Sequence, residues 1–341
     1  MFDDYITTQD TGGVGCHVTF LDASGEPLGT QPRTVFVSVH GSHLYGTSGP
    51  QSDVDLKAIY LNDASDIILE EAEKNQRWST EEEKNGPEDV DIEAIELRKF
   101  VKDALDGQTY AVELLFTPYE MRLVGTSVWN TIVANREELL SQNTKPFMGY
   151  CKTQAKKYSI KGQRLSVIED VLETLDGKPP GDPVEAHLSD LPLDSEYVEC
   201  YKQTIKNQDE PVDMIDVVGK KFELHSPLRK MYESMQSTHS KYGKRAHRSK
   251  DGVDWKAVSH AYRVAFELIE LLTDGRLTFP RPRADFLKRA KHGKLDYTQV
   301  QEDIPEWAEK ALNTESELPE TPNRSFWREW LVDLYQHYVF S

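Results

Sequence analysis

The sequence has few of the features that mark several large classes of protein. Only three of its 341 residues are cysteines and no two of them form a C-x-x-C pair, which excludes a zinc ribbon or a dithiol redox centre and favours a reducing compartment. No apolar run reaches the roughly 18 residues of a membrane span, and the acidic start lacks the basic and apolar segments of a signal peptide. We therefore expect a cytoplasmic protein.

Positive charge is also scarce. The chain has 58 acidic and 40 basic residues, a net charge of −18, so it can bind a polyanion only where basic residues gather on one surface. It has no Walker A, G-x-S-x-G or H-E-x-x-H motif, and the glycines at 12–15 lack the preceding strand of a dinucleotide fingerprint. We therefore set aside kinase, hydrolase and dehydrogenase functions.

The order of hydrophobic patterns predicts an α+β protein, and its length suits two domains. Strand-like patterns come first, at residues 14–21, 34–40, 54–61 and 90–95. An amphipathic helix follows at 97–105. Acidic residues crowd the segment 62–89, which we interpret as a surface excursion. From about residue 126 the pattern is mostly helical, with breaks at 176–194 and 241–250.

A Gly-Ser pair followed by two alternating aspartates is the most informative segment. Gly41 and Ser42 follow the second predicted strand, and Asp53 and Asp55 lie at the start of the third. Strand residues two apart share a face, so the two carboxylates can bind a hard cation such as Mg²⁺. The glycine permits close approach of a phosphate, and Ser42 adds a hydroxyl and an amide. These groups together suit the transfer of a nucleotidyl group from an NTP.

This segment resembles the signature of the DNA polymerase beta-like nucleotidyltransferases, in which Gly-Ser follows one strand and Asp-x-Asp lies on the next. The flanking residues look most like the RlaP-type branch, predicted nucleotidyltransferases associated with RNA repair in bacteria and phages. Blocks similar to that branch follow in order at 96–100, 113–116, 149–154, 259–263 and 291–295.

The resemblance implies a division of the chain and a reaction. Residues 1–125 would form a catalytic domain with a small mixed β-sheet, and residues 126–341 a mainly helical domain that closes over nucleotide and acceptor. The reaction would move a nucleoside monophosphate from an NTP to a hydroxyl acceptor and release pyrophosphate, with two Mg²⁺ or Mn²⁺ ions bound. An RNA end, for example that of a tRNA, is the acceptor implied.

The family also uses a third carboxylate on a neighbouring strand, and three residues are candidates. The resemblance implies Asp91 as the partner of Asp53 and Asp55 in metal binding and catalysis. Glu93 shares the face of Asp91 by the same spacing of two residues. Glu113 could be a structural partner of a basic residue such as Arg98, or it could support the site or act as its base.

Several cations are candidates for binding the nucleotide or the acceptor. Lys57 follows Asp55 by two residues on the same predicted strand face. Lys256, His260 and Arg263 lie at i, i+4 and i+7 of a predicted helix, in a row that suits a triphosphate or an RNA backbone. An ordinary solvated face is the alternative for this row, and a surface position is the alternative for Lys57.

Further basic residues lie in the second half of the chain. Lys152 and Lys156 are one helical turn apart, and a basic loop contains Lys241, Lys244, Arg245, Arg248 and Lys250. Either group could bind polyphosphate or RNA, or lie in solvent. His40 and His43 flank the Gly-Ser pair and can titrate near neutral pH, and we treat them as loop residues.

Two other functions stay open from the sequence. The acceptor could be a protein hydroxyl, which would make the chain an AMP-transferring regulator or antitoxin, and the acidic surface suits a basic protein partner. Alternatively the fold could serve as a non-catalytic sensor of nucleotide or RNA. The base of the NTP, the oligomeric state and any adaptation of the acidic surface to salt have no signal in the sequence.

Overall fold

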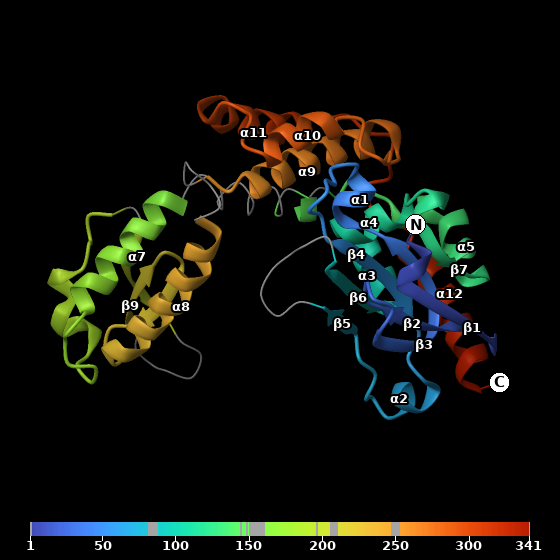
Figure 1. The fold of residues 1–341 in the computed structure, drawn as a ribbon, viewed down its shortest axis with the longest axis horizontal. Coiled ribbons are helices and arrows are strands. Elements are labelled where there is room, and N and C mark those ends of the chain that lie inside the picture. Colours follow the sequence, from blue (N-terminus) through green and yellow to red (C-terminus); the bar gives the residue numbers. More distant parts are fainter. Residues whose placement is uncertain are drawn as a thin grey trace. The chain divides into compact units, whose positions relative to one another are not determined.

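The computed structural model describes residues 2–80, 88–143, 145–147, 149, 161–195, 197–204, 211–246 and 253–340. The chain forms two compact units, one of Met1–Lys152 with Ser259–Ser341 and one of Thr153–Val258 (Figure 1). The first holds a mixed sheet and the C-terminal helices, which confirms the α+β class. These compact units differ from a division at residue 125, and the functional division 1–125 and 126–341 stays a prediction.

Seven strands form the sheet of the first unit. They are β1 (Ile6–Gly13), β2 (Gly15–Leu21), β3 (Pro27–Val39), β4 (Val54–Tyr60), β5 (Asn75–Ser79), β6 (Val90–Glu96) and β7 (Arg122–Gly125). Their order is β1-β2-β3-β4-β6-β5, and β7 pairs with β3. The β4–β6 pair is parallel and the other pairs are antiparallel. The first residues of β4 and β6 therefore lie side by side at the same end of the two strands.

The two central strands alternate between buried apolar and half-buried charged residues. In β4, Val54 and Leu56 are buried and Asp55 and Lys57 are half-buried, and β6 repeats the pattern. The apolar side joins a core with Val18, Phe20, Val37, Val39, Ile92 and Ala94. Because successive strand residues point to opposite faces, Asp55 and Lys57 of β4 lie on the other face, together with Asp91 and Glu93 of β6.

Helices cover this sheet and complete the first unit. The N-terminal part contributes η1 (Asp3–Tyr5), α1 (Gly41–Tyr45), α2 (Ala64–Ile68), α3 (Leu97–Leu105), α4 (Thr109–Leu115), η2 (Tyr119–Met121), α5 (Ser127–Ala134) and η3 (Arg136–Leu139). The C-terminal part contributes α9 (Trp255–Asp274), α10 (Ala284–Lys291), α11 (Tyr297–Leu312) and α12 (Arg324–Phe340). The predicted helix at 97–105 is confirmed as α3.

The last helix returns to the N-terminal sheet. The Tyr335 hydroxyl donates to the Glu96 carboxylate at 2.7 Å, and the Tyr338 hydroxyl donates to the Asn62 carbonyl at 3.0 Å. Trp327 of α12 is fully buried. These contacts join the two ends of the chain in one compact unit.

The second unit has its own sheet and core. It contains α7 (Lys161–Leu175), η4 (Val184–Asp190), β8 (Val198–Gln203), β9 (Val212–Val217), β10 (Lys220–Glu223) and α8 (Leu228–Ala246). The strands are antiparallel in the order β10-β9-β8. Buried residues of both helices and the sheet form the core, among them Ile168, Val171, Ile215, Val217, Met231 and Met235.

Three sequence predictions need correction at this level. The acidic segment 62–89 contains α2 and the strand β5, which pairs with β6, because the hydrogen bonds of an edge strand do not require an apolar pattern. The second half contains a three-stranded sheet as well as helices. The predicted basic loop is helical through Ala246 as part of α8.

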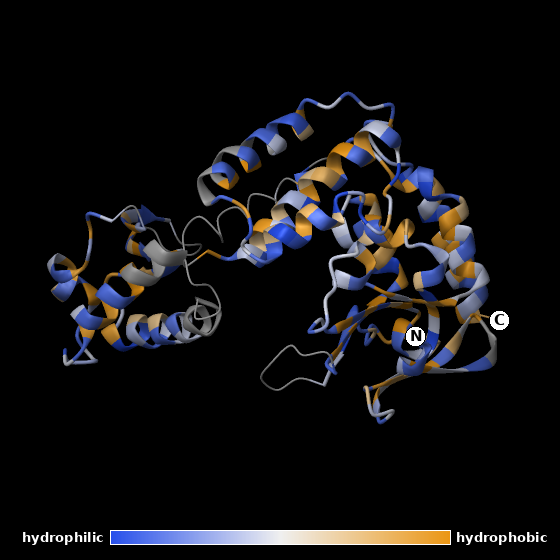
Figure 2. Ribbon diagram, turned by 45° about the horizontal axis from the view of Figure 1, so that its top comes forward, coloured by the Kyte–Doolittle hydropathy of each residue, from blue (hydrophilic) through white to orange (hydrophobic). Residues whose placement is uncertain are grey.

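Hydrophobic residues recur along the strands and helices of both units, where Figure 2 colours the ribbon orange. Within the described ranges, no helix is both long and apolar enough to cross a membrane. Cys16 and Cys200 are free thiols.

Candidate functional site

Two parallel strands bring three aspartates to one end of the sheet. Asp55 and Asp91 are register partners on β4 and β6, and Asp53 comes directly before β4. All three side chains are half-buried. Asp53 and Asp55 are two residues apart and therefore share a face. We call Asp53, Asp55 and Asp91 the aspartate cluster.

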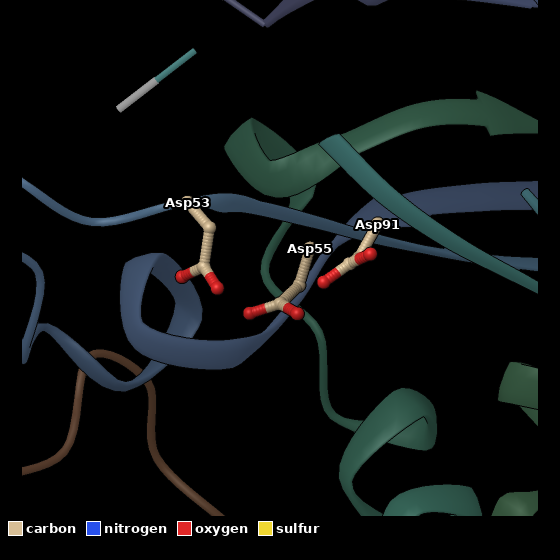
Figure 3. A group of neighbouring side chains, drawn as sticks. All are labelled: Asp53, Asp55 and Asp91. Carbon is tan, nitrogen blue, oxygen red and sulfur yellow. The ribbon is translucent and has the colours of Figure 1, made fainter. Parts of the chain in front are cut away.

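The carboxylates of the aspartate cluster are close enough to share a cation. One oxygen of each lies within 4.8 Å of the others, and Figure 3 shows the three side chains pointing to the same side of the strands. Like charges at this separation repel one another, and a bound cation relieves the repulsion. Carboxylate oxygens are the ligands that Mg²⁺ and Mn²⁺ prefer. The residues present therefore fit a divalent cation.

The end of β3 runs into the Gly-Ser turn next to Asp55. The His40 amide donates to the Asp55 carbonyl at 2.8 Å, which fixes the turn to β4. Gly41 has a φ of +57°, and a Cβ added to it would overlap the Asp55 carboxylate. The glycine is therefore needed for Asp55 to pack against the turn. The Ser42 hydroxyl is buried without a hydrogen-bonding partner among the described residues, so it can still bond a ligand.

Glu93 and Lys57 form the next pair along the same face. They are register partners and their side chains form an ion pair. Glu93 also accepts from the Arg77 guanidinium at 2.6 Å. Burial raises the pKa of the Glu93 carboxyl, but Lys57 and Arg77 together bring it below its ordinary value. The structure therefore pairs Glu93 with protein cations and leaves it outside the aspartate cluster.

Glu113 is buried and contacts residues of α1 and its N-cap, and it is not a member of the aspartate cluster. Its carboxylate accepts from the Tyr45 hydroxyl at 2.9 Å and lies 3.2 Å from His40 Nε2. It also forms an ion pair with Arg263. The alternative that Glu113 pairs with a basic residue is confirmed, but the partner is Arg263 and not the example Arg98, which pairs with Glu96.

Arg263 links Glu113 to further buried charges. Its guanidinium contacts the Glu267 carboxylate at 2.9 Å and lies 4.0 Å from the centroid of the Tyr45 ring. Arg281 lies 3.7 Å from Glu267, and its backbone amide donates to the Tyr45 carbonyl at 3.1 Å. We call this group the buried network, with members His40, Tyr45, Glu113, Arg263, Glu267, Glu270 and Arg281.

The two central carboxylates of the buried network have opposite pKa shifts. Burial raises the pKa of Glu267 to about 8, against the attraction of Arg263. Burial acts in the same direction on Glu113, but Arg263, His40 and Tyr45 bring the pKa of Glu113 far below its ordinary value. Because both carboxylates contact one guanidinium, they titrate as a coupled pair. The raised pKa of Glu267 favours its protonated form at neutral pH.

The other predicted cations have different surroundings. Arg263 is buried among carboxylates, so the helical row predicted from the sequence is not a uniform solvated face; His260 is half-buried and Lys256 exposed. Lys152 and Lys156 lie outside the described residues, as do Arg248 and Lys250. The backbone at Lys241, Lys244 and Arg245 belongs to α8. Nucleotide contacts by Lys57, Lys152, His260 and Arg263 stay predictions.

The sequence analysis did not single out Tyr45, Glu267 or Arg281. Glu267 follows Arg263 by four residues on one helix, a spacing that brings side chains together. That spacing is common on solvated faces, which is why it gave no signal of burial. Tyr45 follows Gly41 by four residues, and its position in that segment did not indicate a contact with buried charges.

Comparison with known proteins identifies the family of this chain. Residues 23–170, which include the aspartate cluster and the Gly-Ser turn, match the family model RlaP, described as RNA repair pathway DNA polymerase beta family. An uncharacterized 38.9 kDa protein from the nrdC–mobD intergenic region of Enterobacteria phage T4 is 33% identical over 328 residues, which cover 89% of this chain and 97% of the phage protein. The chain therefore belongs to the RlaP family, the RNA repair pathway branch of the DNA polymerase beta family.

Proposed function

We propose that the protein is a metal-dependent nucleotidyltransferase that moves a nucleoside monophosphate from an NTP to a hydroxyl at an RNA end. The observation that carries this proposal is the meeting of Asp53, Asp55 and Asp91 within 4.8 Å, beside a Gly-Ser turn. Membership in an RNA repair family supports an RNA acceptor, such as a tRNA.

The aspartate cluster would hold Mg²⁺ or Mn²⁺, and two ions would suit the attacking and leaving oxygens. A cation bound there supplies positive charge to the triphosphate and lowers the pKa of the acceptor hydroxyl. The half-buried position of the three carboxylates strengthens their electrostatic field relative to full exposure. Asp91 is the third ligand in this proposal, because Glu93 and Glu113 are both engaged by protein cations.

The Gly-Ser turn would receive the triphosphate. The buried Ser42 hydroxyl would donate to a phosphate oxygen, and Gly41 would keep Asp55 against the turn. In the reaction, the acceptor oxygen bonds to the α-phosphorus while the bond from that phosphorus to the bridging oxygen breaks. Pyrophosphate leaves, and a carboxylate of the aspartate cluster accepts the hydroxyl proton.

The test is transfer of label from NTP by the full chain. The protein is incubated with Mg²⁺ or Mn²⁺, total tRNA, cell extract and each α-labelled NTP in turn, and the products are separated on a denaturing gel. We expect metal-dependent label in RNA, lost in Asp53→Asn, Asp55→Asn and Asp91→Asn. Asp106→Asn is the control and should retain transfer, because this half-buried carboxylate pairs with Arg324 outside the aspartate cluster. Full transfer by Asp55→Asn would contradict the proposed site.

The same gel separates the two alternative functions. Label in protein would favour an AMP-transferring regulator or antitoxin, for which the net charge of −18 suits a basic partner. NTP binding without any transfer would favour a non-catalytic sensor.

A further inference from the structure

α10 and the turn after it form a basic surface in an otherwise acidic chain. Between residues 283 and 294 the only acidic residue is Asp285. The basic residues of this stretch are Arg283, Lys288, Arg289, Lys291, His292 and Lys294. All are exposed or half-buried. Within the described part of the chain, neither Lys288 nor Arg289 forms an ion pair with a carboxylate, so their charge is directed to solvent or to a ligand.

This surface begins beside α1 and leads to the Gly-Ser turn. The Ala284 Cβ lies 3.4 Å from the position that a Cβ on Gly46, the residue after α1, would take. Ala284, Lys288 and Lys291 lie at i, i+4 and i+7 and therefore share one face of α10. The Lys291 ammonium interacts electrostatically with the His43 imidazole. The Gly46 contact and this interaction place this face of α10 beside α1, the helix that contains Ser42 and His43.

A pocket lies at the same end of α10 as Ala284, beside the preceding residue Arg283. The Arg283 guanidinium is 4.5 Å from the centroid of the Phe266 ring and 4.9 Å from that of Trp307. The two rings meet edge to face at 4.8 Å. With Asp274 and Thr273 they line a cavity of about 310 Å³, which is the size of a small-molecule site. Aromatic rings and arginine planes stack on nucleobases, and a carboxylate accepts from base N–H groups.

We propose that α10 binds the acceptor RNA as a single strand, with phosphates along Lys288 and Lys291 and one unpaired base in the cavity of Phe266, Arg283 and Trp307. This inference rests on the proposed nucleotidyl transfer and specifies its acceptor. An eight-residue helix is about 12 Å long, the length of about three stacked nucleotides. A base inside a duplex cannot enter the cavity, so the acceptor end must be unpaired.

The test measures RNA binding without transfer. Fluorescence anisotropy of the full chain is recorded with a labelled single-stranded RNA and with the same RNA in a duplex, in the absence of NTP and divalent cations. We expect tighter binding of the single strand. Trp307→Ala should weaken that binding about fivefold or more, whereas Trp307→Phe keeps a stacking surface and most of the affinity. Arg283→Ala, at an exposed position, gives the same loss without removing a ring from the helix packing.

The cations are tested by the dependence of binding on salt. Lys288→Gln and Lys291→Gln should each lower the slope of log affinity against log salt by about 0.7. Arg328→Gln, an exposed arginine on α12, is the matched control and should leave the slope unchanged. Unchanged RNA affinity in both Arg283→Ala and Trp307→Ala, or duplex RNA bound as tightly as single strand, would overturn the inference.

Nucleotide binding separates this inference from the proposed function. Binding of a fluorescent ATP analogue with Mn²⁺ is measured on the same variants. Weakened nucleotide binding with unchanged RNA binding in Lys288→Gln and Lys291→Gln would mean that the cations serve the triphosphate, which overturns the inference and leaves nucleotidyl transfer standing. RNA binding by α10 without any label transfer would support the inference and contradict the proposed function.

Discussion

Two groups of carboxylates border the Gly-Ser turn, and they differ in how their charge is balanced. In the aspartate cluster, three carboxylates face one another within 4.8 Å. In the buried network, Glu113 and Glu267 both contact Arg263, and Arg281 contacts Glu270 at 2.6 Å. The first group thus brings like charges together, whereas the second pairs each charge with its opposite.

The difference indicates different roles for the two groups. Like charges held close together cost stability, and a binding site for a cation gives a reason to keep them. Buried charges that are paired inside the protein fix the elements that carry them, and removal of one partner is costly. The buried network holds α1 through Tyr45 and His40, so it positions the turn that borders the aspartate cluster. Charge removal should therefore reduce activity in one group and stability in the other.

The largest effect is expected from Asp55→Asn. It removes one carboxylate that would hold the cation, so nucleotidyl transfer should fall by about 10³-fold or more. The melting temperature without metal should stay the same or rise, because a like-charge repulsion is relieved. Initial rates of label transfer and thermal melts measure the two effects. A large fall in the melting temperature together with the loss of transfer would contradict the distinction between the two groups.

Glu113→Gln should show the opposite pattern, a large loss of stability. It leaves the buried Arg263 with less compensation, which costs about 3–5 kcal/mol. Asp106→Asn, which breaks exposed ion pairs with Lys102 and Arg324, should cost about 1 kcal/mol or less. Urea unfolding at pH 7 compares the two variants.

The loss of stability in Glu113→Gln should also depend on pH, and it should become smaller in acid. Because folding lowers the pKa of Glu113, its contribution is present above the unfolded value of about 4.3 and is lost as the pH falls toward the folded value. The difference between wild type and Glu113→Gln should therefore shrink in acid. A difference that grows in acid would reverse the assigned sign.

Gly41→Ala tests the geometry that joins the two groups. The new Cβ would overlap the Asp55 carboxylate, at a φ of +57° that alanine disfavours. We expect a stability loss of about 1–2 kcal/mol and a loss of transfer of about 10²-fold from the displaced carboxylate. Gly25→Ala has a similar backbone strain, with a φ of +87°, but nothing lies within 4 Å of its Cβ. It should lose stability alone, and equal losses of activity in both variants would exclude the clash as the cause.

Glu267→Gln should act mainly on the pH dependence of stability. Because burial raises the pKa of Glu267 to about 8, the stability of the wild type should fall as the pH rises from about 4.3 to 8, by at most about 1.4 kcal/mol per pH unit. Glutamine resembles the protonated form, so the variant should match wild type near pH 4 and become the more stable protein as the pH rises to 8. Chemical unfolding at these two pH values gives the comparison, and an identical pH dependence of the two proteins would contradict a raised pKa of Glu267.

The aspartate cluster could be predicted from sequence because its signal is local. Asp53 and Asp55 lie two residues apart on a strand, and the apolar alternation around Asp91 marks a second strand. The bounds of β4, β6 and α3 follow from the same alternation and agree with prediction to within one residue. The choice of Asp91 over Glu93 and Glu113 came from the resemblance to the family, and the parallel register that places Asp91 opposite Asp55 needed the structure.

The buried network could not be predicted in the same way, because its contacts join distant segments. Glu113 and Arg263 are 150 residues apart, and neither has a local pattern that distinguishes a buried charge from a solvated one. The same reason explains the missed strands. The polar residues of β5 and the short strands β8 to β10 carry no strong period, and their pairing decides their conformation.

The most direct test of the central claim is Mn²⁺ binding to the aspartate cluster, measured by calorimetry on the full chain without NTP or RNA. We predict binding by the wild type and by Asp106→Asn, and strongly weakened binding by Asp55→Asn and Asp91→Asn, with all four proteins folded by circular dichroism. Equal affinity for Mn²⁺ in the wild type and in Asp55→Asn would contradict a metal centre at Asp53, Asp55 and Asp91.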